Sequence, residues 1–158
     1  MLSIADIFKN HNEEIYRYFF IRTSSKETAE DLASEVFIKF IKTIDSYDST
    51  KSSVRTWLYL IAKGILINYF KKESSHKNLG AEIIEDLVSD EDLDQKANIS
   101  LILVAINGMA EADRELLILR YVNGLKVKEI AEVLNLNYIN AKVKIHRSLL
   151  KLKNLLND

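Results

Sequence analysis

The chain of 158 residues contains no proline and only four glycines, so few positions can interrupt a helix. Apolar residues recur three and four positions apart along almost its whole length. No run shows the strict alternation of polar and apolar residues that a half-buried strand needs. The sequence therefore predicts an all-α fold, and its length allows either one ordinary domain or two small ones.

Composition excludes several classes of protein. Without cysteine, the chain has no disulfide and no cysteine-ligated metal site. Its three histidines, His11, His76 and His146, are far apart in the sequence, so we expect no metal and no cofactor. The longest apolar runs, 57–62 and 101–106, are far shorter than the roughly 20 residues that span a bilayer. No export signal is visible at the N-terminus, so we expect a soluble cytoplasmic protein without membrane insertion.

Charge divides the chain into three parts. Residues 1–73 carry 11 Lys and Arg against 10 Asp and Glu, residues 74–100 carry 2 against 7, and residues 101–158 carry 9 against 6. We therefore expect two small helical domains, at 1–73 and 97–158, joined by an acidic linker at 74–96. Residues 133–157 contain cations and no acid, which favours a polyanionic partner because each cation near a phosphate releases counterions. A solvated helix face is the alternative.

The N-terminal block predicts three helical segments. Spacing over residues 4–22 indicates a helical hairpin or a bent helix with a break near His11. The run 24–27 has the pattern of a capping box, in which the Ser24 hydroxyl accepts from the amide of residue 27. The helix that follows should bury one stripe, Leu32, Ala33, Val36, Phe37, Phe40, Ile41 and Ile44. After a polar loop, a helix over 54–72 should turn inward Trp57, Leu58, Ile61, Ala62, Ile65 and Tyr69.

The C-terminal block predicts helices at about 97–107, 111–122, 126–134 and 138–155, with the pair Asn123 and Gly124 supplying a positive φ after the second. The last two resemble a helix-turn-helix, with Asn135 in a left-handed conformation and Asn137 as N-cap. The final helix should turn inward Ala141, Ile145, Leu149, Leu152 and Leu156. Its outer face should present Ile139, Asn140, Val143 and Arg147, flanked by Lys142 and Lys144. Major-groove reading needs such a face, although a plain helical hairpin with a lysine-rich exterior is the alternative.

Two motifs resemble a known family. Residues 112–131, ADRELLILRYVNGLKVKEIA, with 141–147, AKVKIHR, resemble region 4 of bacterial RNA polymerase sigma factors. Residues 29–37, AEDLASEVF, are similar to the core-polymerase-binding helix of region 2. Residues 54–63, VRTWLYLIAK, and 68–72, NYFKK, are similar to the helix that binds the promoter −10 element. Together they cover nearly the whole chain and resemble the extracytoplasmic-function subgroup of the sigma-70 family.

The resemblance implies an alternative sigma factor, not an enzyme, that binds core RNA polymerase and directs promoter-specific initiation. The largest-subunit clamp helices would be bound by Asp31, Ser34, Glu35 and Ile38. The melted −10 strand, with a base flipped into loop 46–53, would be bound by Tyr47, Asp48, Lys51, Arg55, Lys63, Asn68, Lys71 and Lys72. The −35 duplex would be bound by Asn140, Lys142, Val143, Lys144 and Arg147.

Further roles follow from the same resemblance. Trp57 and Tyr59 would offer stacking surfaces to unwound strand, with Trp57 also a candidate core residue. Arg114 and Arg120 would add contacts to the DNA backbone or form structural ion pairs. The linker would suit the positively lined RNA-exit channel, or serve only as a tether. The flap of the second-largest subunit and an anti-sigma factor would be further partners.

Three other functions are weighed against this one. A stand-alone helix-turn-helix regulator would need a dimer surface and a fixed half-site spacing. An all-α adaptor that binds only proteins would show no salt-dependent affinity for DNA. An enzyme is the weakest alternative, because no nucleophile–base pair, phosphate-binding loop or metal-ligand spacing appears in the sequence.

Overall fold

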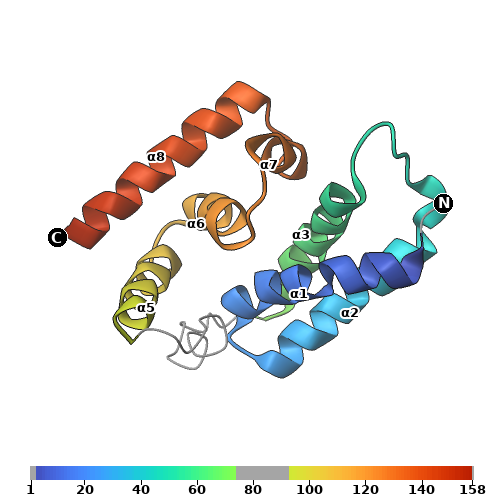
Figure 1. Ribbon diagram of the computed structural model, residues 1–158, viewed down its shortest axis with the longest axis horizontal. Helices are drawn as coiled ribbons and strands as arrows, with labels where there is room; N and C mark the ends of the chain where they lie inside the picture. The colour runs from blue at the N-terminus through green and yellow to red at the C-terminus, as the bar shows by residue number, and fades with distance from the viewer. Residues whose placement is uncertain (1–2, 74–92, 158) are drawn as a thin grey trace. The chain divides into compact units, whose positions relative to one another are not determined.

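The computed structural model describes residues 3–73 and 93–157, and within these ranges all regular secondary structure is helical (Figure 1). The predicted all-α fold is confirmed. The chain divides into two compact units, with helices α1 to α3 in the first and α5, α6 and α8 in the second. Most of the predicted linker, residues 74–92, lies outside the described residues. None of the described helices is both long and apolar enough to cross a membrane.

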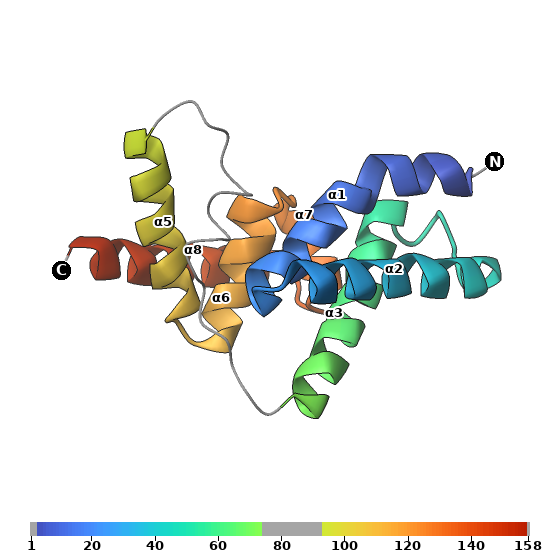
Figure 2. The same ribbon diagram turned by 90° about the horizontal axis from the view of Figure 1, so that it is seen from below.

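The first unit contains α1 (Ile4–Thr23), α2 (Lys26–Lys42), the short 3-10 helix η1 (Ile44–Ser46) and α3 (Val54–Lys72). Figure 2 shows α1 and α2 side by side along most of their length. Of the two predicted alternatives, the helical hairpin is wrong, because α1 is one continuous helix. The polar residues at this point pair one turn apart instead, with His11 Nδ1 2.8 Å from Glu14 Oε2. The bounds expected for α3 are confirmed.

The turn between α1 and α2 corrects the predicted capping box by one residue. Ser24 adopts a left-handed φ of 59° and its amide donates to the Phe20 carbonyl, so it ends α1. Ser25 is the N-cap of α2, and its hydroxyl accepts from the Thr28 amide at 3.2 Å. A residue that closes one helix in the left-handed region cannot also take the extended conformation of an N-cap.

The core of the first unit follows the predicted stripe of α2, with two exceptions. Ile41 is exposed at the edge of the stripe, and Ile44 is only half-buried because α2 ends before it, at Lys42. Helix α3 packs on both α1 and α2, so it buries a wider arc than one stripe. Trp57 and Tyr69, which were predicted to point inward, are only half-buried. The buried residues of α3 are Thr56, Leu58, Tyr59, Ile61, Ala62, Ile65 and Leu66.

The first helix of the second unit begins earlier than predicted. Helix α5 (Leu93–Asn107) starts four residues before position 97, inside the predicted linker, since no proline or glycine interrupts residues 93–107. Helix α6 (Glu111–Leu117) continues into η2 (Ile118–Val122), a π-helical turn in which the Asn123 amide donates to the Ile118 carbonyl at 2.9 Å. The single α-helix predicted over 111–122 therefore ends in a wider turn. Gly124 has the predicted positive φ, 70°.

The predicted helix-turn-helix is confirmed as α7 (Val127–Val133) and α8 (Tyr138–Asn157). Asn135 adopts φ 55°, and the Asn137 side chain accepts from the Asn140 amide at 2.7 Å, as expected for the turn and the N-cap. The expected inner face of α8 is buried at Ala141, Ile145 and Leu152, but Leu149 is only half-buried. Leu156 is exposed because the last residues of the helix, 153–157, are exposed all round.

Asn135 provides a local test of the turn. Asn135→Ala should destabilise the second unit by about 1 kcal/mol, because a Cβ without a compensating polar group is disfavoured in the left-handed region. Asn135→Gly should be neutral or slightly stabilising, since glycine adopts positive φ freely. Hydrogen exchange of the α7 and α8 amides measures both effects. Equal protection in the alanine and glycine variants would contradict the assigned backbone conformation.

Candidate nucleic-acid interface

The outer face of α8 carries all the residues predicted to bind the −35 element. Every one of them is exposed, namely Asn140, Lys142, Val143, Lys144 and Arg147. Ile139 stands beside them with 73% of its surface exposed. No acidic residue occurs between Tyr138 and Asn157, so nothing on this helix offsets the positive charge. The face combines cations, an amide and two apolar side chains, which suits the phosphates and base edges of a DNA groove.

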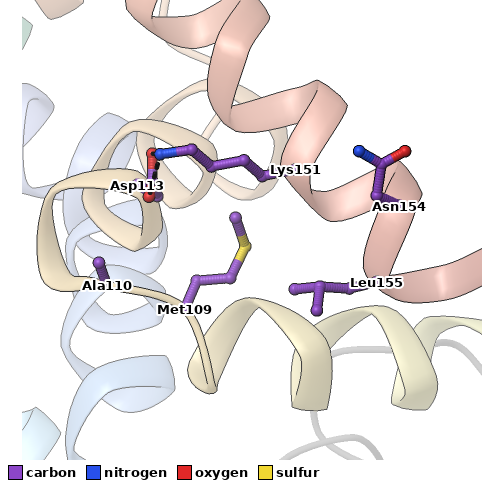
Figure 3. Close-up of a pocket in the computed structure, with 6 residues that line it drawn as sticks. All are labelled: Met109, Ala110, Asp113, Lys151, Asn154 and Leu155. Atoms are coloured by element: carbon purple, nitrogen blue, oxygen red, sulfur yellow. Dashed lines mark hydrogen bonds and ion pairs between the residues drawn. The ribbon is translucent and has the colours of Figure 1, made fainter. Parts of the chain in front are cut away.

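The side of α8 that faces α6 makes a contact that the sequence did not predict. The buried Ser148 hydroxyl donates to Asp113 Oδ1 at 2.6 Å, and Lys151 Nζ lies 3.2 Å from Asp113 Oδ2. Figure 3 shows Lys151 pointing toward Asp113 above a cavity of about 350 Å³, which Met109 and Leu155 also line. The Ser148 hydrogen bond lowers the pKa of the Asp113 carboxyl against the opposing effect of burial, and Lys151 adds to the lowering. The first turn of α6 therefore anchors the middle of α8.

We predict energetic coupling between Asp113 and Ser148. Asp113→Ala should destabilise the second unit by about 1 to 2 kcal/mol, because it leaves the buried Ser148 hydroxyl without its partner. Ser148→Ala added to that variant should cost little more, since no unsatisfied hydroxyl then remains. Hydrogen exchange of the α6 and α8 amides in the two single variants and the double variant measures the coupling. Additive losses would show that the two side chains act independently.

Arg114 and Arg120, for which the sequence allowed either a DNA contact or a structural role, form contacts inside the second unit. Arg114 Nη1 donates to the Asn107 carbonyl at 3.0 Å, and its Nη2 forms an ion pair with Glu111. Arg120 Nη1 donates to the Leu125 carbonyl at 2.8 Å, across the bend that contains Gly124. Both side chains therefore bind the backbone of neighbouring turns. This favours a structural role for the two arginines over contacts to the DNA backbone.

In the first unit, the four residues predicted to bind polymerase lie on one face of α2. Asp31, Ser34, Glu35 and Ile38 are spaced three and four apart, and all are exposed. Ser34 also lines a depression of about 460 Å³ between α1 and α2, together with Tyr16. This face is partly acidic and partly apolar.

The loop before α3 rests on aromatic rings. The half-buried Tyr47 donates its hydroxyl to the Ser52 carbonyl at 2.9 Å, and its ring lies 5.9 Å from that of Trp57. Asp48 Oδ1 accepts from the amide and the hydroxyl of Thr50, and these hydrogen bonds lower the pKa of the Asp48 carboxyl. Lys51 is exposed. The loop thus carries an ionised Asp48 carboxylate and an exposed Lys51, and its Tyr47 ring packs against Trp57.

Helix α3 places its predicted DNA-binding residues in different surroundings. Asn68, Lys71 and Lys72 are exposed, and Lys63 is half-buried. The stacking role predicted for Tyr59 is wrong, because its ring is fully buried with its centroid 5.8 Å from that of Tyr18. A tyrosine on the inner side of α3 cannot reach a DNA strand.

A polar network joins Arg55 to α1. Arg55 Nε lies 2.9 Å from Glu14 Oε1, and the Tyr59 hydroxyl donates to the same oxygen at 2.7 Å. Burial alone would raise the pKa of the Glu14 carboxyl, but hydrogen bonds from His11, Tyr59 and Arg55 outweigh it and leave the pKa below its ordinary value of 4.5. The first turn of α3 is therefore fixed to the middle of α1 by an ionised carboxylate.

The lowered pKa of Glu14 predicts a pH dependence for the first unit. A carboxyl whose pKa is lower in the folded state stabilises that state above its ordinary pKa, and the stabilisation is lost as the pH falls through the lowered value. The stability of the first unit should therefore fall more steeply below pH 4.5 in the wild type than in Glu14→Gln. Urea unfolding between pH 6 and about 3, followed by Trp57 fluorescence, measures this. Parallel curves would contradict the prediction.

Comparison with known proteins identifies the family of this chain. The family model for sigma-70 region 2 matches residues 7–76, and the model for sigma-70 region 4 matches residues 99–152. RNA polymerase sigma factor YlaC of Bacillus subtilis is 31% identical over 157 residues, with 96% of this chain and 90% of that protein covered. The chain belongs to the sigma-70 family of RNA polymerase sigma factors. ECF RNA polymerase sigma factor SigW of Bacillus subtilis, at 30% identity over 99% of this chain and 90% of its own length, places it in the extracytoplasmic-function subgroup.

Solved structures of sigma factors share the fold. CnrH, solved in complex with the cytosolic domain of CnrY, has a TM-score of 0.73 at 16% identity, with 98% of this chain and 87% of that chain covered. RpoE of Bartonella quintana, solved with the anti-sigma factor NepR, has a TM-score of 0.70 at 18% identity, with 95% and 94% covered. This sigma factor therefore directs transcription initiation, and a stand-alone regulator is not favoured. Sigma factors as a class are initiation factors rather than catalysts.

Proposed function

We propose that this sigma factor joins core RNA polymerase through α2 and reads promoter DNA with its two units. In the second unit, α8 lies along the major groove of the −35 duplex. In the first, α3 and loop 46–53 hold the opened −10 strand. The observation that carries this proposal is the outer face of α8, where every residue assigned to the −35 element is exposed on an acid-free helix. Cations there bind phosphates, and the remaining side chains meet base edges.

Each contact surface supports a separate part of the proposal. The face of α2 that contains Asp31 and Ile38 fits the clamp helices of the largest subunit, by acidic and apolar contact respectively. At loop 46–53 a flipped nucleobase would meet the paired rings of Tyr47 and Trp57. It would also meet the ionised Asp48 carboxylate and the exposed Lys51 cation. Lys71 and Lys72 stand at the exposed end of α3, where a phosphate backbone would bind them.

The proposal assigns no covalent step to this chain. Binding free energy for the opened strand offsets the few kcal/mol that unpairing and flipping a base cost. Each unit offers few phosphate contacts, so the free protein should bind DNA weakly. Core polymerase sets the distance between the two units. We place the first unit at residues 1–73 and the second at residues 93–158, because α5 begins at Leu93.

Further partners follow from the same proposal. The second unit would contact the flap of the second-largest polymerase subunit. An anti-sigma factor would regulate the protein, because RpoE, a protein of the same fold, is solved in complex with the anti-sigma factor NepR. Because its partners are polymerase and promoter DNA, the protein would act in the cytoplasm.

Footprinting with and without core polymerase tests the proposed function. Purified chain alone should leave promoter DNA unprotected, and the chain with core polymerase should protect both the −35 and the −10 regions. A stand-alone regulator would protect DNA without polymerase. A protein that binds only other proteins would give no additional protection in either case, and this would contradict the proposal.

A further inference from the structure

Arg55, one of the residues predicted to bind the −10 strand, pairs with α1. Its Nε lies 2.9 Å from Glu14 Oε1, and only 27% of its side chain is exposed. The centre of its guanidinium group lies 5.9 Å from the centroid of the fully buried Tyr59 ring. A guanidinium between a carboxylate and an aromatic ring already has a counterion and a stacking partner. A phosphate would have to displace this carboxylate before it could bind Arg55.

The geometry of α3 separates Arg55 from the other cations predicted to bind DNA. At about 100° per residue, Arg55 lies about 160° around the helix from Lys71 but only about 40° from Tyr59. Lys71 and Lys72 are exposed, whereas Tyr59 faces the core. Arg55 therefore lies on the inner side of α3, away from the surface that Lys71 occupies.

Arg55 also lies between the two residues through which α3 holds loop 46–53. Ser53, two positions before it, is the N-cap of α3. Trp57, two positions after it, has its ring 5.9 Å from that of Tyr47 in the loop. The Trp57 amide donates to the Ser53 carbonyl at 3.0 Å, so all three residues belong to one helical turn. A shift of this turn would therefore move both attachments of the loop.

The loop is held by α2 at its beginning and by this turn of α3 at its end. The Tyr47 ring lies 6.2 Å from that of Phe40 on α2, and the Tyr47 hydroxyl donates to the Ser52 carbonyl at 2.9 Å. The contact between Arg55 and Glu14 then ties the turn of α3 to α1. The Glu14–Arg55 pair therefore fixes where the end of the loop lies relative to α1.

We propose that Glu14 and Arg55 are positioning residues for capture of the opened −10 strand. The pair holds the first turn of α3, and with it loop 46–53, in the conformation that receives a flipped base. Arg55 itself contributes no phosphate contact. The inference rests on the proposed function, in which this loop holds the flipped base. It changes the role of Arg55 and gives Glu14, on α1, a role in promoter opening.

Glu14→Gln separates positioning from phosphate binding by the sign of its effect. The substitution removes the charge but keeps an oxygen that accepts hydrogen bonds. If Arg55 bound a phosphate, loss of the competing carboxylate would raise DNA affinity. If the pair positions the loop, holoenzyme should lose about fivefold in affinity for a fork probe with a duplex −35 element and a single-stranded −10 element, the effect of one lost hydrogen bond. Affinity for the −35 duplex alone should stay unchanged.

Arg55→Gln tests the same point through salt dependence. It should lower fork-probe affinity by a similar factor without changing the slope of log affinity against log salt. Lys71→Gln, which removes an exposed cation assigned to a phosphate, should instead lower this slope by about 0.7, the value for one contact to a single strand. Glu14→Gln combined with Arg55→Gln should lose no more than either single variant, because both break one pair.

Trp57 fluorescence reports the position of the turn in the free protein. Glu14→Gln should shift the emission of this single tryptophan in the folded state, since Trp57 lies in the turn that the pair holds. Ser25→Ala is the matched control. It removes the N-cap hydroxyl of α2, so it destabilises the same unit at the opposite end of α2 from the loop. It should change neither the folded-state emission nor the fork-probe affinity.

All measurements are made where each variant keeps the helical signal of the wild type. Unchanged or higher fork-probe affinity in Glu14→Gln, a lower salt slope in Arg55→Gln, or unchanged Trp57 emission would overturn the inference alone. Equal effects of Glu14→Gln and Ser25→Ala would also overturn it, because they would indicate loss of stability only. If wild-type holoenzyme binds the fork probe no more tightly than the −35 duplex, the proposed function and this inference fail together.

Discussion

Alanine at both Lys144 and Arg147 should lower promoter binding by the holoenzyme about 30-fold while leaving its affinity for core polymerase unchanged. Both side chains are exposed on α8, with no acid on the helix to pair with them. About 1 kcal/mol for each lost exposed contact to a phosphate accounts for this factor. Two fewer phosphate contacts should also lower the slope of log affinity against log salt by about 2.

Binding of the double variant is best followed as promoter affinity across a salt series, beside core-polymerase affinity measured separately. Lys153→Ala is a control that removes one charge from the exposed end of the same helix, far from its N-terminus. It should lower promoter affinity by about twofold or less. Equal loss of promoter and core binding by a double variant that keeps the helical signal of the wild type would contradict the assignment of α8 to the −35 element.

Glu14→Ala should destabilise the first unit by about 2 kcal/mol. The substitution leaves Arg55 and the buried Tyr59 hydroxyl without their shared carboxylate, and it breaks the polar link between α1 and α3. Removing one partner of a buried ion pair costs about 3–5 kcal/mol, but here the side chains of Glu14 and Arg55 are 17% and 27% exposed, so solvent screening reduces the loss.

The single tryptophan makes the Glu14 prediction measurable in the full chain. Trp57 lies on α3, so the change in its fluorescence during urea unfolding reports on the first unit. Glu13→Ala is the matched control, because the neighbouring glutamate is 90% exposed and its nearest partner, Arg17, is 3.8 Å away. The control should shift stability by less than about 0.5 kcal/mol. Similar shifts for Glu13→Ala and Glu14→Ala would contradict the structural role of the network.

Local sequence chemistry predicted much of the fold. The absence of proline and the spacing of apolar residues indicated helices throughout, and the bounds of α3 followed from the polar loop before it and its apolar spacing. Asn135 and Asn137 predicted the turn because their side chains suit a left-handed residue and an N-cap respectively. The outer face of α8 followed from helical periodicity alone.

Contacts between distant residues could not be predicted in the same way. Periodicity shows which face of a helix is buried but not what meets it, so the pairs Glu14–Arg55 and Asp113–Ser148 were missed. Ser148 does lie on the inward face of α8, and a polar residue there signals a buried hydrogen bond. The buried state of Tyr59 was missed because α3 packs against two helices rather than one.

Run-off transcription tests the central claim most directly. Purified core polymerase is supplied with the full chain or with buffer, on DNA from upstream of the gene that encodes this protein. A transcript with a defined start should form only when the chain is present, and it should be strongly reduced by the Lys144→Ala and Arg147→Ala double variant. Failure of the chain to associate with core polymerase, or the absence of any chain-dependent transcript on such templates, would contradict its assignment as a promoter-reading sigma factor.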